Sequence, residues 1–167
     1  PGLGELDLHL FAEGRHWQIY EKLGAHLAEV GGVSGCHFAV WAPNAQRVSV
    51  VGDWNGWDGR IHPMRKHPGA GIWEIFLPGV TEGAHYKFEI LSCRGELLLK
   101  SDPYAFFSQH GLQTASIVHS LHRYLWADAE WMGERSRHPW HKSPVSIYEV
   151  HLGSWARVPE AGDRPLS

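Results

Sequence analysis

Short runs of apolar and β-branched residues, separated by glycine, proline and asparagine, dominate the middle of the chain. From Gly35 onward these runs recur about every ten residues, the spacing typical of an antiparallel sandwich. The chain is therefore predicted to be mainly β, with an immunoglobulin-like β-sandwich over residues 33–120. The six predicted strands are 36–41, 47–52, 72–77, 84–92, 96–100 and 116–119.

The run over residues 84–92 indicates how its strand is oriented. Tyr86, Phe88 and Ile90 alternate with polar positions, which places these three side chains toward the core. Lys87 then lies on the opposite face. Arg94-Gly95 follows the run and predicts a tight hairpin turn.

The segments on either side of this region have a different texture. Apolar positions over residues 5–23 fit two short helical pieces, so we expect 1–32 to be a helical linker from a removed upstream region. Residues 121–143 are rich in tryptophan and charge without a clear period and are expected to be a second linker. Residues 144–155 return to strand texture, as a single strand with no successor.

Charge and hydropathy exclude several classes of partner. The formal net charge is -3 and the sequence pI is about 6.5, so we expect no nucleic-acid partner. No apolar stretch approaches the ~18 residues of a membrane span, and residues 1–10 lack the features of a signal peptide. We therefore expect no membrane association and a cytoplasmic location.

The residues that bind metals or form disulfides are not arranged for either purpose. The 13 histidines are scattered, and His119 and His122, three residues apart, lack companion ligands. We predict no metal site and no cofactor. Cys36 and Cys93 are expected to be free thiols, because an oxidised scaffold of this length usually carries more cysteines.

Several separated segments carry a resemblance to a known family. Residues 38–45 (FAVWAPNA) and 48–58 (VSVVGDWNGWD) resemble the starch- and glycogen-associated sandwich module that precedes many α-amylase-type barrels. Residues 86–89 and 100–105 match the same module. Residues 147–155 (IYEVHLGSW) look like the first barrel strand of glycogen branching enzymes, and 10–14 and 20–26 also resemble the bacterial members.

This resemblance implies a parent enzyme of glycogen biosynthesis, a glycosyltransferase that cuts α-1,4-glucan and forms α-1,6 branches. Such enzymes use a nucleophilic carboxylate and an acid/base carboxylate, which in the family lie on later barrel strands. Residues 144–167 would be the remnant of the first strand of the (β/α)8 barrel. We expect the chain itself to have no catalytic residues. Asp53 and Asp58 are the nearest carboxylate pair, but turn formation explains both better.

The implied partners are an α-1,4-glucan, such as glycogen or a malto-oligosaccharide, and the enzyme's own barrel. A tryptophan plane can cover the apolar face of a glucose ring while lysine, asparagine or threonine meets the hydroxyls. Trp54 and Trp57 bracket one turn, with Asn55 between them. Glycogen-binding modules of a kinase regulatory β subunit have a tryptophan matching Trp57, a lysine matching Lys87, and a loop matching roughly Leu112, Thr114 and Ser116. The expected glucan-binding residues are Trp57, Lys87, Trp54, Asn55, Leu112 and Thr114.

Other tryptophans have other expected roles. Trp41 and Trp73 lie in strand runs and are predicted to pack in the core. Trp126, Trp131 and Trp140 lie in the second linker, where they would pack against a barrel. The strand after Arg94-Gly95 carries Leu97 and Leu98 where the kinase subunit has a second binding tryptophan.

Two alternatives remain open. The module could be an interdomain packing unit without sugar contact, in which case Trp57 and Lys87 would not converge on a ligand. It could also come from a debranching or trehalose-releasing amylase-family enzyme, although the ending Gly153-Ser154-Trp155 favours the branching enzymes.

Overall fold

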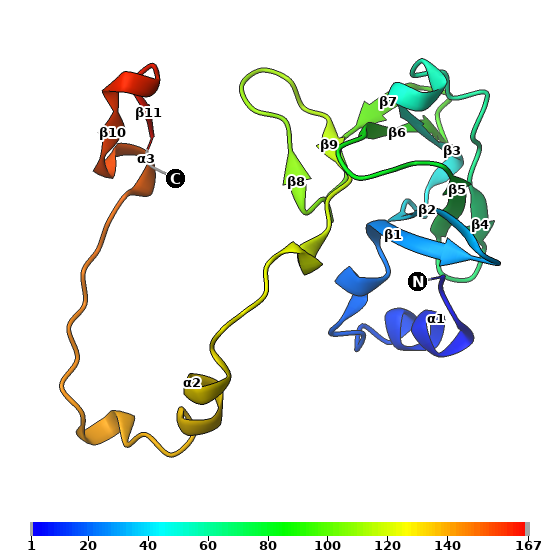
Figure 1. Ribbon diagram of the computed structural model, residues 1–167. Helices are drawn as coiled ribbons and strands as arrows, with labels where there is room; N and C mark the ends of the chain where they lie inside the picture. Colours follow the sequence, from blue (N-terminus) through cyan, green and yellow to red (C-terminus); the bar gives the residue numbers. More distant parts are fainter. Residues whose placement is uncertain (1, 166–167) are drawn as a thin grey trace. The chain divides into compact units, whose positions relative to one another are not determined.

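The computed structural model describes residues 2–165 and divides the chain into two compact units (Figure 1). The first unit ends at Leu125 and holds two antiparallel sheets together with the N-terminal helices. The second begins at Trp126. The expectation of a mainly β sandwich is confirmed in the first unit.

One sheet has four strands in the order β1-β2-β5-β4. Every neighbouring pair is antiparallel, so the sheet is built from hairpins and returning connections. Its members are β1 (Gly24–Val30), β2 (Val33–Trp41), β5 (Ile72–Pro78) and β4 (Arg65–His67).

The other sheet is arranged around β6 (His85–Ser92), which pairs with β3 on one side. On its other side, the first residues of β6 pair with β9 and its later residues pair with β7. The turn between β6 and β7 contains Arg94 and Gly95, as predicted from the sequence. The remaining strands are β3 (Ala45–Gly52), β7 (Leu97–Lys100), β8 (Phe107–Ser108) and β9 (Ser116–Ile117).

The core between the sheets is built on the alternation seen in the sequence. Tyr86 and Phe88 are fully buried, and Ile90 packs against the same cluster. Phe38 of β2 meets Tyr86 edge-to-face, with ring centroids 5.0 Å apart. Lys87 lies on the outer face, as expected, since neighbouring residues of a strand point to opposite faces.

The sandwich begins earlier than the sequence suggested. Residues 24–30, expected to belong to a helical linker, form β1 and pair with β2 along its length. Gly31 and Gly32 both have positive φ and close this hairpin, and two adjacent glycines between apolar runs are a hairpin signal that the prediction missed. The helical part is confined to α1 (Glu5–Ala12) and η1 (Ile19–Glu21).

The N-terminal segment covers the outer face of the four-stranded sheet. Leu3, Leu8 and Phe11 pack against a second buried cluster around Leu23 and Ile72. This packing gives apolar side chains on both faces of the sheet a place away from water. The first unit therefore has a helical cover, a four-stranded sheet and a second sheet.

The two strand tryptophans expected in the core differ from each other. Trp73 is 5% exposed and donates a hydrogen bond from Nε1 to the Ala42 carbonyl at 2.9 Å, so its prediction is confirmed. Trp41 is 54% exposed, and its prediction was wrong. It ends β2 and faces the N-terminal cover, where it touches the edge of Phe11, with ring centroids 6.0 Å apart.

Glu74 fastens this cover to the sheet. Its carboxylate lies 3.0 Å from His37 Nε2 and 2.6 Å from His67 Nε2, and it accepts a hydrogen bond from the Leu3 backbone N–H at 3.3 Å. Burial alone would raise the pKa of the Glu74 carboxyl. The hydrogen bonds from His67, Leu3 and His37 outweigh burial, so the pKa of Glu74 lies below its usual range.

Replacing Glu74 with Gln should destabilise the first unit at neutral pH by about 1–2 kcal/mol. A carboxyl whose pKa is lowered by folding contributes stability above its unfolded pKa of about 4.3, and this contribution is lost as the pH falls through the folded pKa. The difference from wild type should therefore shrink in acid. Urea unfolding across pH 3–7 measures it, with exposed Glu29→Gln as the control. A difference that is constant with pH would contradict this assignment.

The second unit contains short elements only. They are α2 (Ala129–Glu134), η4 (Trp140–Lys142), α3 (Leu152–Trp155), β10 (Arg157–Val158), η5 (Pro159–Ala161) and β11 (Arg164–Pro165). Residues 144–151 have no regular secondary structure, so the strand predicted over 144–155 does not form. A barrel strand is held by neighbours on both sides, and no strand within residues 2–165 pairs with residues 144–151.

Trp131 and Trp140 of the second unit are about half exposed and contact each other edge-to-face, with ring centroids 5.6 Å apart.

Among residues 2–165, no helix is long and apolar enough to cross a bilayer. Cys36 is buried and Cys93 is exposed, and both are free thiols.

Candidate functional site

The turn after β3 carries three of the expected site residues. It begins with η2 (Asp53–Asn55) and continues through Gly56, whose φ is 61°. Asn55 is buried and bonds inside the turn: its Oδ1 accepts from the Gly52 N–H at 2.9 Å and its Nδ2 donates to the Val50 carbonyl at 3.0 Å. Asn55 thus shapes the turn, and the expectation that its amide faces a ligand is not supported by this geometry.

Trp54 also turns inward. Its ring packs on the core cluster, and its centroid lies 5.6 Å from that of Phe38. Its Nε1 is buried and has no hydrogen-bond partner within the described residues. Trp54 is therefore partly buried, with its ring packed against Phe38 and the core cluster.

Trp57 differs from Trp54 in both exposure and backbone conformation. It is 38% exposed and has a φ of 62°, in the left-handed region that large side chains rarely adopt. A hydrogen bond from its N–H to the Gly52 carbonyl at 3.2 Å helps hold this conformation. Strain of this kind is retained where the surrounding structure fixes it, and it is frequent at ligand-binding positions.

Lys87 lies on the outer face of β6 and contacts the loop before β9. Its Nζ donates to Thr114 Oγ1 at 2.8 Å. The Thr114 carbonyl in turn accepts a hydrogen bond from Ser101 Oγ. The structure therefore brings together two of the expected site residues, Lys87 and Thr114, while Leu112 is fully exposed on the same loop.

The turn with Trp57 is fastened to the face that carries Lys87. Asp53 Oδ2 accepts a hydrogen bond from the His85 backbone N–H at 3.0 Å, two residues before Lys87. Further along the turn, a Cβ added at Gly59 would collide with the carboxylate of Glu89, two residues after Lys87. Residues 53–59 thus lie across the outer face of β6 on both sides of Lys87.

Leu99 is an outer-face residue that sequence reasoning missed. It lies opposite Glu89 across the β6–β7 pair, so it points to the same side as Lys87, and it is 53% exposed. Leu97 shares this face, whereas Leu98 is half-buried on the other. The period of two along β7 would have identified Leu97 and Leu99 as the exposed pair.

The acidic residues of the turn are each held by a neighbouring basic side chain. Asp58 makes an ion pair with Arg60 at 2.6 Å, and the hydrogen bonds from Arg60 lower the pKa of the Asp58 carboxyl to about 2. Such a carboxyl cannot serve as a general acid near neutral pH. Asp53 is engaged by His85, with Oδ2 2.9 Å from its Nδ1. Among residues 2–165, no group of three or more potential metal ligands is found.

Comparison with known proteins agrees with this arrangement. A family model for carbohydrate-binding module 48, the isoamylase N-terminal domain, matches residues 22–105. This range includes β1, Trp57 and Lys87 but ends before Leu112 and Thr114.

The whole chain is also similar to bacterial enzymes named 1,4-alpha-glucan branching enzyme GlgB. The proteins from Paramagnetospirillum magneticum and Rhodospirillum rubrum are each 58% identical over 168 aligned residues. The alignments cover 100% of this chain but 23% and 22% of those proteins. The chain thus spans less than a quarter of the length of these relatives.

Among solved structures, a putative α-amylase from Salmonella typhimurium matches with a TM-score of 0.58 at 24% identity. The match covers 80% of this chain and 20% of that one, and it supports the fold alone. The sandwich, its match to the family model over half the chain and its outer-face residues lead to one assignment. The chain belongs to the carbohydrate-binding module 48 family.

Proposed function

We propose that this chain is a non-catalytic glucan-binding module of a 1,4-alpha-glucan branching enzyme, and that it binds α-1,4-glucan on the outer face around Trp57 and Lys87. The observation that carries the proposal is the placement of the Trp57 turn across this face. It brings a turn with a partly exposed indole to the face whose Lys87 is hydrogen-bonded to Thr114.

The chemistry of this face suits a neutral sugar chain. The indole of Trp57 can cover the apolar face of a glucose ring, and the exposed side chains of Leu99 and Leu112 offer further apolar surface. The Lys87 ammonium retains further donors for hydroxyl oxygens after its bond to Thr114. Trp54 and Asn55 support the face from below.

The parent's activity follows from the similar proteins, which are named as branching enzymes. In such a parent, this module would hold glycogen near a barrel that performs the transfer. The exposed Trp131 and Trp140 of the second unit would pack against that barrel. A cytoplasmic location remains a prediction from the sequence.

Binding without catalysis predicts the behaviour of this chain in a native gel that contains glycogen. The wild-type chain should migrate more slowly than in a gel without glycogen, because immobile polysaccharide retains a protein that binds it. It should release no sugar from glycogen and form no branches. Unchanged mobility would favour the alternative of a packing module without sugar contact.

Replacing Lys87 with Ala should weaken glucan binding by about fivefold, because it removes one charge-assisted contact to sugar hydroxyls. The same gel, run over a series of glycogen concentrations, gives the affinity. Lys100→Ala is the matched control, since Lys100 is an exposed lysine on the neighbouring strand β7. Equal retardation of both variants would remove Lys87 from the site.

A further inference from the structure

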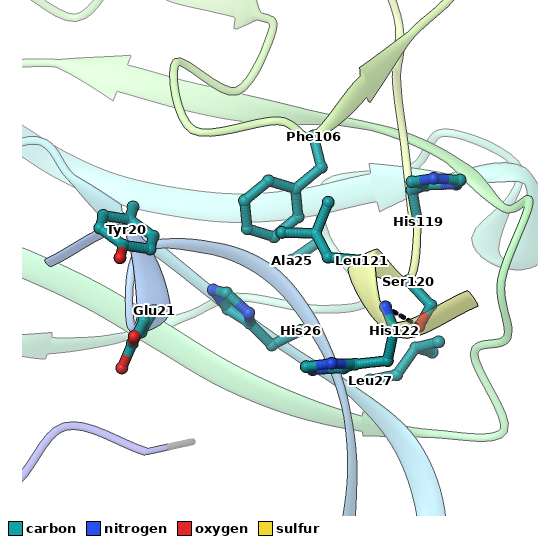
Figure 2. A pocket seen from close by; sticks show the side chains of 10 residues that line it. All are labelled: Tyr20, Glu21, Ala25, His26, Leu27, Phe106, His119, Ser120, Leu121 and His122. Atoms are coloured by element: carbon teal, nitrogen blue, oxygen red, sulfur yellow. Dashed lines mark hydrogen bonds between the residues drawn. The ribbon is translucent and has the colours of Figure 1, made fainter. Parts of the chain in front are cut away.

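A pocket in the first unit shares no residue with the outer face around Trp57 and Lys87. Its volume is about 450 Å³, and its walls come from η1, β1, the residue before β8, and η3 (Leu121–Arg123) (Figure 2). Small-molecule sites commonly occupy about 300–1,000 Å³. The pocket therefore has room for a small ligand or for the end of a longer one.

One wall is the free edge of a sheet. β1 is the terminal strand of its sheet and, within residues 2–165, pairs with β2 alone. Alternate residues of an edge strand direct their N–H and C=O groups away from the sheet. Ala25 and Leu27 of this strand line the pocket, so backbone donors and acceptors stand along the wall.

The ring of His26 is held by a hydrogen bond to a backbone carbonyl and by an aromatic contact. His26 Nε2 lies 2.9 Å from the Leu23 carbonyl. A carbonyl only accepts, so this nitrogen carries the proton, and in the neutral ring Nδ1 remains as an acceptor. The ring of Phe106 meets His26 edge-to-face, with centroids 5.4 Å apart, and Figure 2 shows both rings at the pocket.

The segment η3 supplies a second imidazole to the lining, that of His122. The His122 backbone N–H donates to Ser120 Oγ at 3.3 Å, whereas its ring makes no hydrogen bond to any residue of the 2–165 range. His122 is exposed, and Tyr20 and Leu121 line the pocket with it.

The charge of the lining selects the class of ligand. Among the residues that the structure describes, the lining includes Glu21 but no lysine or arginine, so a phosphate or carboxylate ligand would lack the usual cationic partner. Aromatic faces, neutral imidazole edges and backbone polar groups instead match a neutral ligand with apolar faces and hydroxyl edges. Sugar rings have this character.

We infer that this pocket is a second glucan subsite, which takes the end of an α-1,4-glucan chain independently of Trp57. The choice of glucan rests on the proposed function, while the preference for a neutral hydroxylated ligand rests on the lining. His122 and the Nδ1 edge of His26 would meet hydroxyls, and the rings of Phe106 and Tyr20 would cover the sugar face.

The test is a titration of the ¹⁵N-labelled Trp57→Ala variant with maltotriose, followed by the amide shifts of each residue. We expect saturable shifts at Leu27, Leu121 and His122, because this variant retains the pocket. Adding His122→Ala should raise Kd by about fivefold. His141→Ala is the matched control, as His141 is an exposed histidine of the second unit. Phe106→Ala supplies an independent change in another segment of the lining.

The outcomes separate this inference from the proposed function. If maltotriose shifts only amides around Trp57 and Lys87 in the wild-type chain and nothing in the Trp57→Ala variant, the second subsite is overturned and the proposed function stands. If maltotriose shifts no amide in either protein, both the second subsite and the proposed function are overturned. If pocket amides shift but neither His122→Ala nor Phe106→Ala changes Kd, the assignment of the lining residues is overturned.

Discussion

Replacing Asp102 with Ala should lower the free energy of unfolding by about 3 kcal/mol or more, the largest effect we expect from a single substitution. Asp102 is 6% exposed, and its Oδ2 accepts a hydrogen bond from the Tyr86 hydroxyl at 2.6 Å. Its Oδ1 accepts another from the Tyr104 N–H at 2.8 Å. Alanine would leave both donors buried without partners, beside the fully buried ring of Tyr86.

The pH dependence gives this prediction a second readout. Burial is the dominant influence and raises the pKa of the Asp102 carboxyl above its usual range, against the hydrogen bonds from Tyr86 and Tyr104. The folded state therefore favours the protonated acid. Protonated Asp102 therefore contributes to the free energy of unfolding. This contribution is fully present below the unfolded pKa of about 3.9 and is lost as the pH rises through the folded pKa.

Asp102→Asn is the matched control, because it keeps an acceptor for the Tyr104 N–H and removes the titration. Its unfolding free energy should lie between those of wild type and Asp102→Ala, and the pH-dependent term should be absent. Urea unfolding followed by tryptophan fluorescence measures all three proteins. A loss below about 1 kcal/mol for Asp102→Ala would mean that the Tyr86 hydroxyl finds another partner.

Replacing Trp57 with Gly should separate binding from stability. Glycine adopts a positive φ without strain, which offsets part of the packing lost with the indole. The free energy of unfolding should therefore change by no more than about 1 kcal/mol, since Trp57 is partly exposed. Glucan affinity should fall by about thirtyfold, as expected when an aromatic anchor is removed.

Trp17→Gly is the control for nonspecific loss of an indole, because Trp17 is 87% exposed and lies outside the proposed face. It should leave glucan affinity unchanged. If Trp57→Gly instead destabilises the fold by several kcal/mol and keeps its affinity, Trp57 is a packing residue and the interdomain alternative gains support.

The sandwich was predictable because its strands alternate strongly and end at turn residues. Residues 84–92 show this best: Tyr86 and Phe88 are buried while Lys87 points outward. β1 was not found because its run, interrupted by His26 and Glu29, has weaker alternation and follows a helical segment. The strand expected over 144–155 is absent for a different reason. A sequence with strand-like residues forms a strand only when neighbouring strands pair with it.

The candidate site was predictable in part. Lys87 and Thr114 are 27 residues apart in sequence, and their contact was expected only through the resemblance to glycogen-binding modules. The roles of Trp54 and Trp57 could not be separated by sequence, because the inward turn of one indole depends on its packing against Phe38. The pocket beside β1 could not be foreseen either, since its walls come from segments up to about 100 residues apart.

The proposed function depends most on the binding of α-1,4-glucan by the outer face around Trp57 and Lys87. Calorimetric titration of the 167-residue chain with maltoheptaose, beside the Trp57→Gly variant, tests it most directly. Glucan binding at this face predicts saturable heat for the wild-type chain and a Kd about thirtyfold higher for the folded Trp57→Gly variant. Absence of heat for wild type, or equal affinity of the two proteins, would contradict it.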